Sequence, residues 1–526
     1  MAVARVACRA QVGLHAPLVQ VEVSLASGLP AFCIVGLPAT VVKESKERVR
    51  AALLNSRFQF PAGRITVSLS PAELPKEGGR FDLPIALGIL IASGQIRVPP
   101  GAASDTPTCE YYGELGLNGE LKPVRGLLLA AAHARGQGHE LVVPQANAAE
   151  AAAVAPAHAR AAGHLLEVCA HLRGATPLPP CAAPGRCLTA QPGTAAAAHA
   201  RTDLADVRGQ LQAKRALMVA AAGGHALLMV GPPGSGKSML AQRLPSLLPP
   251  LAEGEALEVA AIAAVSAAGF PPERLGERPF RAPHHSASTA ALVGGGARAL
   301  PGEISLAHQG VLFLDELPEF ARPVLEALRE PLETGWVAVS RAALQTLYPA
   351  AFQLVAAMNP CPCGRLGDPS GSCRCTPAQV RRYRGRISGP LLDRLDLQVE
   401  VPRLTAAEFD ARAGAAESTA VAAARVARAR AAQIARQGTC NARLSDAGVQ
   451  RWCAPDETGR RLLESAMRRF GFSGRAHQRL LRVARSVADL EGSPAVSATH
   501  IGEAVMLRFM DRGATAPFAA CDRRPA

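Results

Sequence analysis

Residues 231–238 read GPPGSGKS, which fits the pattern G-x-x-x-x-G-K-S. The apolar stretch HALLMV precedes the pattern and the helix-forming stretch SMLAQRL follows it, which is the setting that a phosphate-binding loop requires. Glycines let backbone N–H groups approach phosphates, Lys237 would reach the β- and γ-phosphates, and Ser238 would ligate Mg²⁺. We therefore predict a nucleotide-binding loop made of Gly231, Pro232, Pro233, Gly234, Ser235, Gly236, Lys237 and Ser238.

Two later apolar stretches end in residues suited to nucleotide hydrolysis. GVLFLDELPEF places Asp315 and Glu316 directly after a predicted buried strand. There Asp315 would hold Mg²⁺ and Glu316 would polarise the attacking water. FQLVAAMNP ends a third strand at Asn359, whose neutral amide could orient water near the γ-phosphate. An acidic strand end without a catalytic role is the alternative for the pair, but the preceding phosphate loop favours the catalytic interpretation.

Four cysteines are clustered in the segment NPCPCGRLGDPSGSCRC, as the pairs Cys361/Cys363 and Cys373/Cys375. Four thiolates suit the tetrahedral sulfur cage of Zn²⁺, although C-x-x-C is the commoner structural spacing. A disulfide pair would be unusual in a reducing compartment, and four idle thiols are the remaining alternative. The clustering of four thiols, despite the unusual spacing, favours a zinc site that would stiffen the chain between Asn359 and Arg394.

Two arginines complete the set of candidate residues. SGPLLDRLDL presents Arg394 on a short helix-like segment, and FSGRAHQRLL presents Arg475 at the start of a predicted helix. Composition alone favours ordinary surface arginines at both positions.

Charge and composition limit the possible partners. The net charge of +14 is uneven: residues 376–526 hold 25 arginines and 15 acids, a balance of +10. This excess indicates either solvated arginine-rich helices or a surface that binds polyanions. No long uncharged apolar run and no secretory signal is visible, so we expect a cytoplasmic protein without a membrane segment.

The sequence predicts three structured parts and one linker, and the candidate residues depend on these parts for their positions. Residues 1–174 alternate strand-like and helical stretches, and 175–200 are rich in Pro, Gly and Ala, as a linker would be. In 201–403 the strands and helices alternate as in a parallel-sheet nucleotide-binding core. Residues 404–526 have helical periodicity and predict a helical lid domain.

The segments GPPGSGKS, LFLDE, AMNP, LLDRLD and SGRA, in this order, resemble those of AAA+ P-loop ATPases. RPFRAPHHSASTAALVGGGARALPGEISLAHQG, NPCPCG and CRCTPAQVRRYR are similar to the Mg-chelatase-like ComM/YifB family, over essentially the whole chain. This resemblance implies ATP and Mg²⁺ as cofactors and a homo-oligomeric, hexameric ring. It also implies that Arg394 is an arginine finger acting on the neighbouring subunit and that Arg475 is a sensor arginine of the lid.

The first domain resembles the Lon-protease (S5 domain 2-like) fold, whose active site is a Ser/Lys dyad. Arg80 stands where that family has its serine, and Leu128 stands where it has its lysine. Without a nucleophile and its base, no covalent route to peptide cleavage exists. We expect no protease activity and a role in assembly or partner binding.

The family resemblance implies a DNA helicase or branch-migration motor in natural transformation and recombination, acting on single-stranded or branched DNA. Residues 335–352 resemble a presensor hairpin that faces the pore of a ring, where Arg341 is the first candidate DNA contact. Two alternatives stay open: a chelatase motor subunit that drives metal insertion into a porphyrin, and an ATPase that remodels proteins.

Overall fold

The computed structural model describes residues 3–36, 40–97, 108–182, 203–296, 299–341, 344–367, 372–404, 417–508 and 510. The chain forms two compact units. The first contains residues 1–194 together with 252–277, and the second contains residues 195–251 and 278–526. None of the described helices combines the length and the apolar composition needed to cross a membrane.

The first unit is built on a seven-stranded mixed sheet with the order β3-β4-β2-β1-β5-β8-β9. Its strands are β1 (Val3–Arg9), β2 (Leu18–Ala26), β3 (Ala31–Val35), β4 (Arg64–Ser70), β5 (Cys109–Tyr111), β8 (Glu140–Pro144) and β9 (Ala159–Ala162). A small hairpin pairs β6 (Glu114–Leu115) with β7 (Leu121–Lys122). Buried and part-exposed residues alternate along most of β2, as expected when one sheet face is covered.

Helices pack with this sheet in the first unit, and one of them is almost entirely buried. The helices are α1 (Thr40–Asn55), α2 (Asp82–Ala92), α3 (Leu127–Gln137), α4 (Ala148–Val154) and α5 (Leu165–Leu172). Apolar residues occur all round α2, and the helix packs on β1 and β2. A Cβ atom on Gly88 would lie 2.4 Å from Val23 Cγ2, so glycine permits this close approach of α2 to β2.

A segment from the middle of the chain completes the first unit. Helix α9 (Glu253–Val265) packs on α3, and Arg135 Nη2 lies 2.7 Å from Glu253 Oε1. Ala260, Ala261 and Ala264 are buried in the core of this unit. We expected residues 201–403 to form one domain, but the small alanine face of α9 places 252–277 with the first unit instead.

The predicted linker, residues 175–200, begins as part of the first unit. Leu178 and Cys181 are buried, and Cys181 N donates to Ala159 O at 2.8 Å on β9. Residues 183–200 lie outside the described residues.

The second unit contains a five-stranded sheet with the order β11-β14-β17-β10-β18, and every neighbouring pair is parallel. Its strands are β10 (Leu227–Val230), β11 (Phe280–Arg281), β14 (Val311–Leu314), β17 (Gln353–Met358) and β18 (Leu397–Glu400). All residues of β10, β14 and β17 are buried, as expected for a parallel sheet covered on both faces. The predicted α/β nucleotide-binding core is therefore confirmed.

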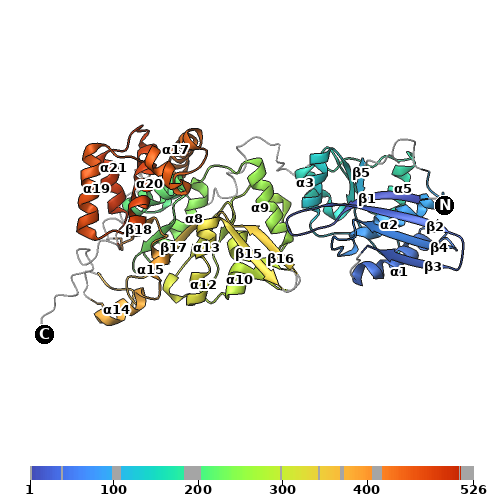
Figure 1. Ribbon diagram of the computed structural model, residues 1–526, viewed down its shortest axis with the longest axis horizontal. Helices are drawn as coiled ribbons and strands as arrows, with labels where there is room; N and C mark the ends of the chain where they lie inside the picture. The colour runs from blue at the N-terminus through green and yellow to red at the C-terminus, as the bar shows by residue number, and fades with distance from the viewer. Residues whose placement is uncertain are drawn as a thin grey trace. The chain divides into compact units, whose positions relative to one another are not determined.

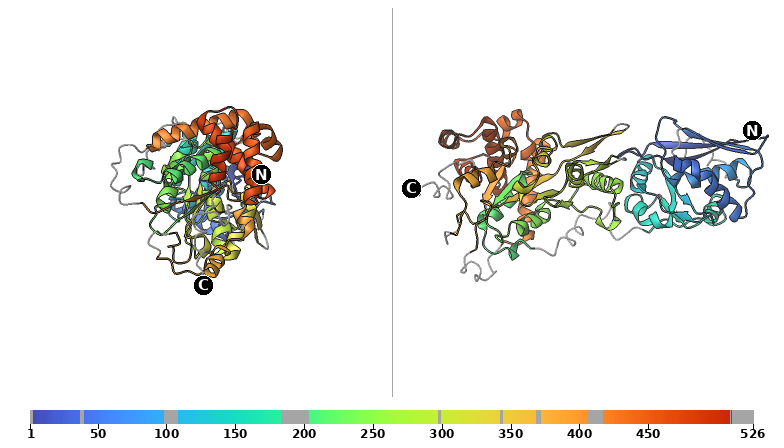
Figure 2. Two further views of the ribbon diagram at one scale, coloured as in Figure 1. Left: turned by 90° about the vertical axis from the view of Figure 1, so that its left-hand side faces the viewer. Right: turned by 90° about the horizontal axis from the view of Figure 1, so that it is seen from below.

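Helices of this core cover the sheet and follow its strands. They are α7 (Leu211–Gly223), α8 (Lys237–Leu247), α10 (Thr289–Val293), α11 (Glu303–Leu306), α12 (Arg322–Glu326), α13 (Arg329–Thr334), α14 (Pro377–Arg384) and α15 (Gly389–Leu392). Strands β15 (Trp336–Arg341) and β16 (Leu344–Pro349) form an antiparallel hairpin. The hairpin extends from the body of the second unit (Figures 1 and 2).

The C-terminal part is helical, as predicted. Its helices are α17 (Thr419–Gln437), α18 (Asp446–Trp452), α19 (Glu457–Phe470), α20 (Gly474–Glu491) and α21 (Ala498–Met506). Helices α17 and α20 pack on α7, and α19 and α20 pack on α21 (Figure 1). Their apolar faces merge with the core of the nucleotide-binding sheet in one buried cluster.

Candidate active site

The phosphate loop joins β10 to α8 at the carboxyl edge of the parallel sheet. Gly234 and Gly236 have φ values of 74° and 92°, in the left-handed region that favours glycine. A Cβ atom on Gly231 would lie 2.1 Å from Val401 O, so no other residue fits without displacement of the backbone just after β18. These glycines allow the loop to curl around the N-terminus of α8, where backbone N–H groups attract phosphate.

Lys237 is the first residue of α8, and its ammonium group turns back into the loop. Nζ lies 2.7 Å from Gly231 O, 2.9 Å from Pro232 O and 3.5 Å from Asn359 Oδ1. The side chain is only 8% exposed. Burial lowers the pKa of Lys237, and the neighbouring carboxylates of Asp315 and Glu316 act in the opposite direction. The group is therefore placed to exchange its carbonyl partners for phosphate oxygens.

Ser238 and Asp315 provide neighbouring oxygen ligands. Ser238 Oγ donates to Asp315 Oδ2 at 2.6 Å, which joins the start of α8 to the end of β14. Hydroxyl and carboxylate oxygens are the hard ligands that Mg²⁺ prefers, usually with water and substrate phosphates completing its coordination. These two residues fit a Mg²⁺ ion that accompanies a bound nucleotide.

Glu316 and Asn359 complete the pocket from two adjacent strands. Glu316 follows Asp315, is 51% exposed along its side chain, and has a left-handed φ of 53°. Asn359 follows β17, which lies between β14 and β10. A pocket of about 450 Å³ is lined by Pro233, Gly234, Ser235, Gly236, Lys237, Ser238, Met239, Asp315, Glu316, Met358 and Asn359. The structure thus brings the predicted phosphate, metal and water-activating residues together.

The two predicted arginines do not line this pocket. Arg394 is 8% exposed, donates to Pro390 O at 2.7 Å and pairs with Glu333. Arg475 lies exposed in the first turn of α20, without a hydrogen bond or ion pair to the residues that the structure describes. Neither side chain is among the residues that line the nucleotide pocket of its own chain.

The four clustered cysteines converge beside the phosphate loop. Cys361 Sγ lies 3.4 Å from Cys363 Sγ and 3.8 Å from Cys373 Sγ, and all four sulfur atoms, including that of Cys375, lie within 4.8 Å of one another. A tetrahedral zinc site with Zn–S bonds near 2.3 Å separates its sulfurs by about 3.8 Å. All four thiols are free, and their spacing fits such a site.

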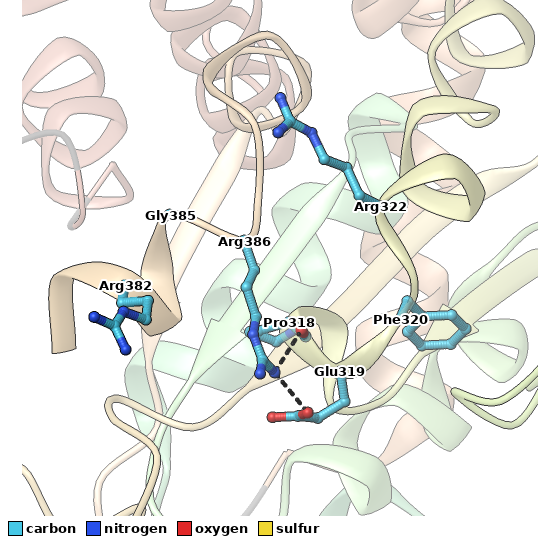
Figure 3. A pocket seen from close by; sticks show the side chains of 7 residues that line it. All are labelled: Pro318, Glu319, Phe320, Arg322, Arg382, Gly385 and Arg386. Atoms are coloured by element: carbon cyan, nitrogen blue, oxygen red, sulfur yellow. Dashed lines mark hydrogen bonds and ion pairs between the residues drawn. The ribbon is translucent and has the colours of Figure 1, made fainter. Parts of the chain in front are cut away.

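An arginine-rich pocket is lined by the segment that follows Asp315 and Glu316. Figure 3 shows Arg386 turned toward Glu319, whereas the side chains of Arg322 and Arg382 extend away from that carboxylate; all three lie on the segments that follow Glu316 and include α14. Arg386 Nη1 donates to Glu319 Oε2 at 2.7 Å, whereas Arg382 has no such partner among the described residues. Three guanidinium groups and one carboxylate give this pocket an excess of positive charge.

In the first unit, the position at which a Lon-type dyad would have its serine holds the buried guanidinium group of Arg80. Arg80 donates to Gln11 Oε1 at 3.1 Å and to Arg125 O at 2.5 Å, and burial lowers its pKa. Leu128 is fully buried. Neither position offers a nucleophile or a base.

Sequence reasoning missed two residues at the active site. His285 Nδ1 lies 3.2 Å from Glu316 Oε2, and Gly364 packs against Pro233 of the phosphate loop. In the sequence, the stretch RAPHHS contributes only to the family resemblance. A histidine in a polar loop belongs to no helical or strand periodicity, so the sequence does not show which residue it contacts.

The features that together define a class are the parallel strand order, the phosphate loop after β10, the acids after β14 on the far side of β17, and the helical lid. They are the features of an AAA+ ATPase, which binds and hydrolyses ATP with Mg²⁺.

Comparisons with known proteins identify the family within this class. Family descriptions match three successive parts: "Subunit ChlI of Mg-chelatase" at 21–147, "Magnesium chelatase, subunit ChlI" at 203–409, and "Magnesium chelatase, subunit ChlI C-terminal" at 416–508. YifB of Salmonella typhimurium is 47% identical, and Competence protein ComM of Haemophilus influenzae is 45% identical; each alignment covers 97% of this chain and 98% of the relative. The protein Rv2897c of Mycobacterium tuberculosis is 44% identical over 97% of this chain and 99% of its own length. The chain belongs to the Mg-chelatase-like ComM/YifB family.

Proposed function

We propose that this ATPase is a ring-shaped DNA helicase that promotes branch migration during natural transformation and recombination. The observation that carries the proposal is the 45% identity, over 97% of the chain, to a relative named as a competence protein. The balance of +10 in residues 376–526 supports a polyanionic partner. Because ATP and DNA are both cytoplasmic in bacteria, we assign the protein to the cytoplasm.

The test of this proposal is the ATPase rate and the oligomer size, each measured with and without forked DNA. We expect forked or single-stranded DNA to stimulate hydrolysis and ATP to favour a hexamer. Binding should weaken steeply with salt because phosphate contacts release counterions, and it should depend little on base sequence. A protein that binds neither DNA form at low salt, with a non-hydrolysable ATP analogue present, would contradict the proposal.

The arginine-rich pocket of Figure 3 is a candidate contact for the DNA backbone. Arg322 and Arg382 are exposed, and Arg386 is held by a surface ion pair of a kind that contributes only about 0–1 kcal/mol. A backbone phosphate could therefore replace Glu319 as the partner of Arg386 at little cost. Guanidinium groups also match phosphate in a bidentate geometry.

A charge-matched pair of double variants tests this pocket. Arg322→Ala/Arg382→Ala should reduce the slope of log binding constant against log salt by about 1.4 for single-stranded DNA, because two phosphate contacts are lost. Arg460→Ala/Arg461→Ala, which removes two exposed arginines from α19, is the control. Equal slopes for the two double variants would exclude a specific role for the pocket.

The hairpin of β15 and β16 is the proposed pore element. Arg341 ends β15, and its replacement by Ala should impair strand displacement and DNA-stimulated turnover more than basal hydrolysis. An equal loss of basal turnover would instead place Arg341 at a subunit interface.

Zinc is the proposed ligand of the cysteine cluster. We expect about one zinc per chain by elemental analysis of freshly purified, reduced protein, released by a thiol-reactive mercurial. Cys373→Ser/Cys375→Ser should lose the metal and unfold at lower temperature. Metal-free reduced protein would favour the interpretation that the four thiols bind nothing. A disulfide does not fit the structure, because the sulfur atoms of Cys361, Cys363 and Cys373 are at least 3.4 Å apart, far more than an S–S bond length.

A chelatase motor subunit is the second candidate function, because the matched family descriptions name magnesium chelatase. The 45% identity over 97% of the chain, first unit included, to a relative named as a competence protein favours the DNA motor instead. Stimulation of ATP hydrolysis by a chelatase partner complex, and not by DNA, would support the chelatase function. Stimulation by unfolded protein would support a protein-remodelling ATPase.

A further inference from the structure

An arginine of the helical lid holds the main chain of Arg394. Arg479 lies on α20, and its Nη1 atom donates to Arg394 O at 3.0 Å and to Asp396 Oδ1 at 2.5 Å. The side chain of Arg479 is 19% exposed and that of Asp396 is 8% exposed, so water has little access to this ion pair. One nitrogen atom of the lid therefore contacts both the backbone of Arg394 and the carboxylate two residues later.

The Asp396 carboxylate joins this contact to the central part of the sheet. Its Oδ2 atom accepts a hydrogen bond from Ala226 N at 3.0 Å, just before β10 begins. Burial by itself would raise the pKa of Asp396, but the hydrogen bond with His225 and the positive charge of Arg479 hold that pKa well below its usual range. The carboxylate is therefore ionised at neutral pH and remains an acceptor for Arg479.

A second lid segment holds the same stretch of main chain. Arg508 follows α21 and is 1% exposed, and its Nη1 atom donates to Leu395 O at 3.1 Å and to Asp396 O at 3.3 Å. Gln398 N, on the edge strand β18, donates to Leu507 O at 2.6 Å. Guanidinium groups of the lid thus contact the carbonyl oxygens of residues 394, 395 and 396. Because buried carbonyl groups need such partners, this stretch must follow a movement of the lid.

The side chain of Arg394 is held differently from its main chain. Its Nη1 atom donates to Pro390 O at 2.7 Å, and its Nη2 atom pairs with Glu333, whose side chain is 57% exposed. Its Nε atom is buried and has no hydrogen-bond partner among the residues that the structure describes. An ion pair that reaches solvent is readily exchanged for another partner. The guanidinium group can therefore leave Glu333 for a phosphate while its backbone stays fixed.

We propose that Arg479 positions Arg394 for its action on the nucleotide of the neighbouring subunit, and so links the lid of one subunit to the active site of the next. It is a positioning residue, because it acts through Arg394 and does not line the nucleotide pocket of its own chain. Arg475 lies one turn earlier on α20, so a movement of this helix displaces both arginines together. The inference rests on the proposed ring and on the role proposed for Arg394.

Mixing of variant chains tests this role. Arg479→Ala should bind an ATP analogue with normal affinity but lower kcat by about 10- to 100-fold, because the arginine finger is misplaced. Lys237→Ala chains lack a working phosphate loop but keep the finger, so adding them to Arg479→Ala chains should restore part of the activity at mixed interfaces. Adding Arg394→Ala chains should restore none, because neither chain then supplies a competent finger.

The opposite pattern would overturn the proposal. If Arg479 acted on the pocket of its own chain, Arg394→Ala chains would restore activity and Lys237→Ala chains would not. An unchanged kcat in Arg479→Ala would also exclude the role. A mixture of Lys237→Ala and Arg394→Ala chains must itself regain activity; its failure in confirmed mixed rings would contradict the finger role of Arg394, and this inference with it.

The control variant is Arg482→Ala, on the same helix and with a side chain 16% exposed. Arg482 Nη2 donates to Leu444 O at 2.7 Å, a contact within the lid, so this variant should lose stability and keep kcat within about twofold. An equal loss of kcat in Arg479→Ala and Arg482→Ala would indicate a general effect on the lid and overturn the proposal. Arg479→Lys keeps the charge beside Asp396, and it replaces Arg479→Ala in the same mixtures if thermal unfolding shows that chain to be misfolded.

Discussion

The contact between the cysteine-rich loop and the phosphate loop makes a sharp prediction for Gly364→Ala. Gly364 has a left-handed φ of 75°, and a Cβ atom there would lie 2.5 Å from Pro233 Cδ and 2.9 Å from Pro233 Cγ. Contacts this short do not occur between real atoms, and the proline ring cannot rotate away. The substitution must therefore displace the phosphate loop, the cysteine loop, or both.

The size of the effect has two parts. Alanine in a left-handed conformation costs roughly 1–2 kcal/mol of folding free energy. Pro233 must move by about 1 Å for its ring atoms to reach an ordinary separation of about 3.5 Å from the new Cβ atom. A displacement of that size in a group that positions a reactant can lower the reaction rate by up to about 100-fold. We expect ATP affinity to fall by about 10- to 100-fold, which is about 1.4–2.7 kcal/mol.

The assay is equilibrium titration with a fluorescent ATP analogue, accompanied by thermal unfolding of each variant. Gly438→Ala is the matched control, because Gly438 also has a left-handed φ of 73°, but a Cβ atom there would have no neighbouring atom within 4 Å. It should lose stability through the same backbone strain and retain normal ATP affinity. Normal ATP binding by Gly364→Ala would refute the reasoning that the cysteine loop determines the position of the phosphate loop.

Four further predictions follow from single residues. Lys237→Ala should abolish tight ATP binding, checked by analogue titration, because it removes the cation that contacts the phosphates. Glu316→Gln should bind ATP but lower turnover by at least about 100-fold, and normal turnover would exclude its role in water activation. Arg394→Ala should bind ATP yet hydrolyse it poorly, and mixing it with Lys237→Ala chains should restore some activity at mixed interfaces; failure in confirmed mixed rings would assign Arg394 to its own subunit. Burial raises the pKa of Asp82 to about 6, against the opposing effect of its hydrogen bond to Arg48. The folded form therefore holds this proton more tightly than the unfolded chain, so the contribution of Asp82 to the unfolding free energy should be greatest below about pH 4 and fall by roughly 3 kcal/mol as the pH rises through about 6. Asp82→Asn should flatten that decline in urea-unfolding series, and an unchanged slope would contradict the assignment.

The parts of the site that could be predicted are those that local sequence determines. GPPGSGKS is contiguous, and its conformation depends on its own glycines. Asp315 and Asn359 follow strongly apolar strands, and parallel strands bring their carboxyl ends to one edge, so their proximity follows from the fold class. The α/β core and the helical C-terminal part were predictable for the same reason.

The parts that could not be predicted depend on contacts between loops or on the packing of small residues. The pairing of His285 with Glu316 requires the strand order, which places β11 beside β14. The burial of Arg394 against Glu333 depends on a tertiary contact between α13 and the segment after α15. Helix α9 is alanine-rich on several faces, so its pattern does not indicate which unit it will join.

The packing of α9 gives the first unit two routes into the nucleotide-binding core besides the predicted linker. One route, residues 248–252, continues directly from α8, the helix that begins at Lys237. The other leaves the first unit after residue 277 and enters β11, the strand that precedes His285. A fragment cut at the linker would consequently remain incomplete, since it lacks the helix that fills its own core. A mechanical load on the first unit would reach both the phosphate-binding helix and the strand before His285 through covalent bonds, without a separate signalling surface.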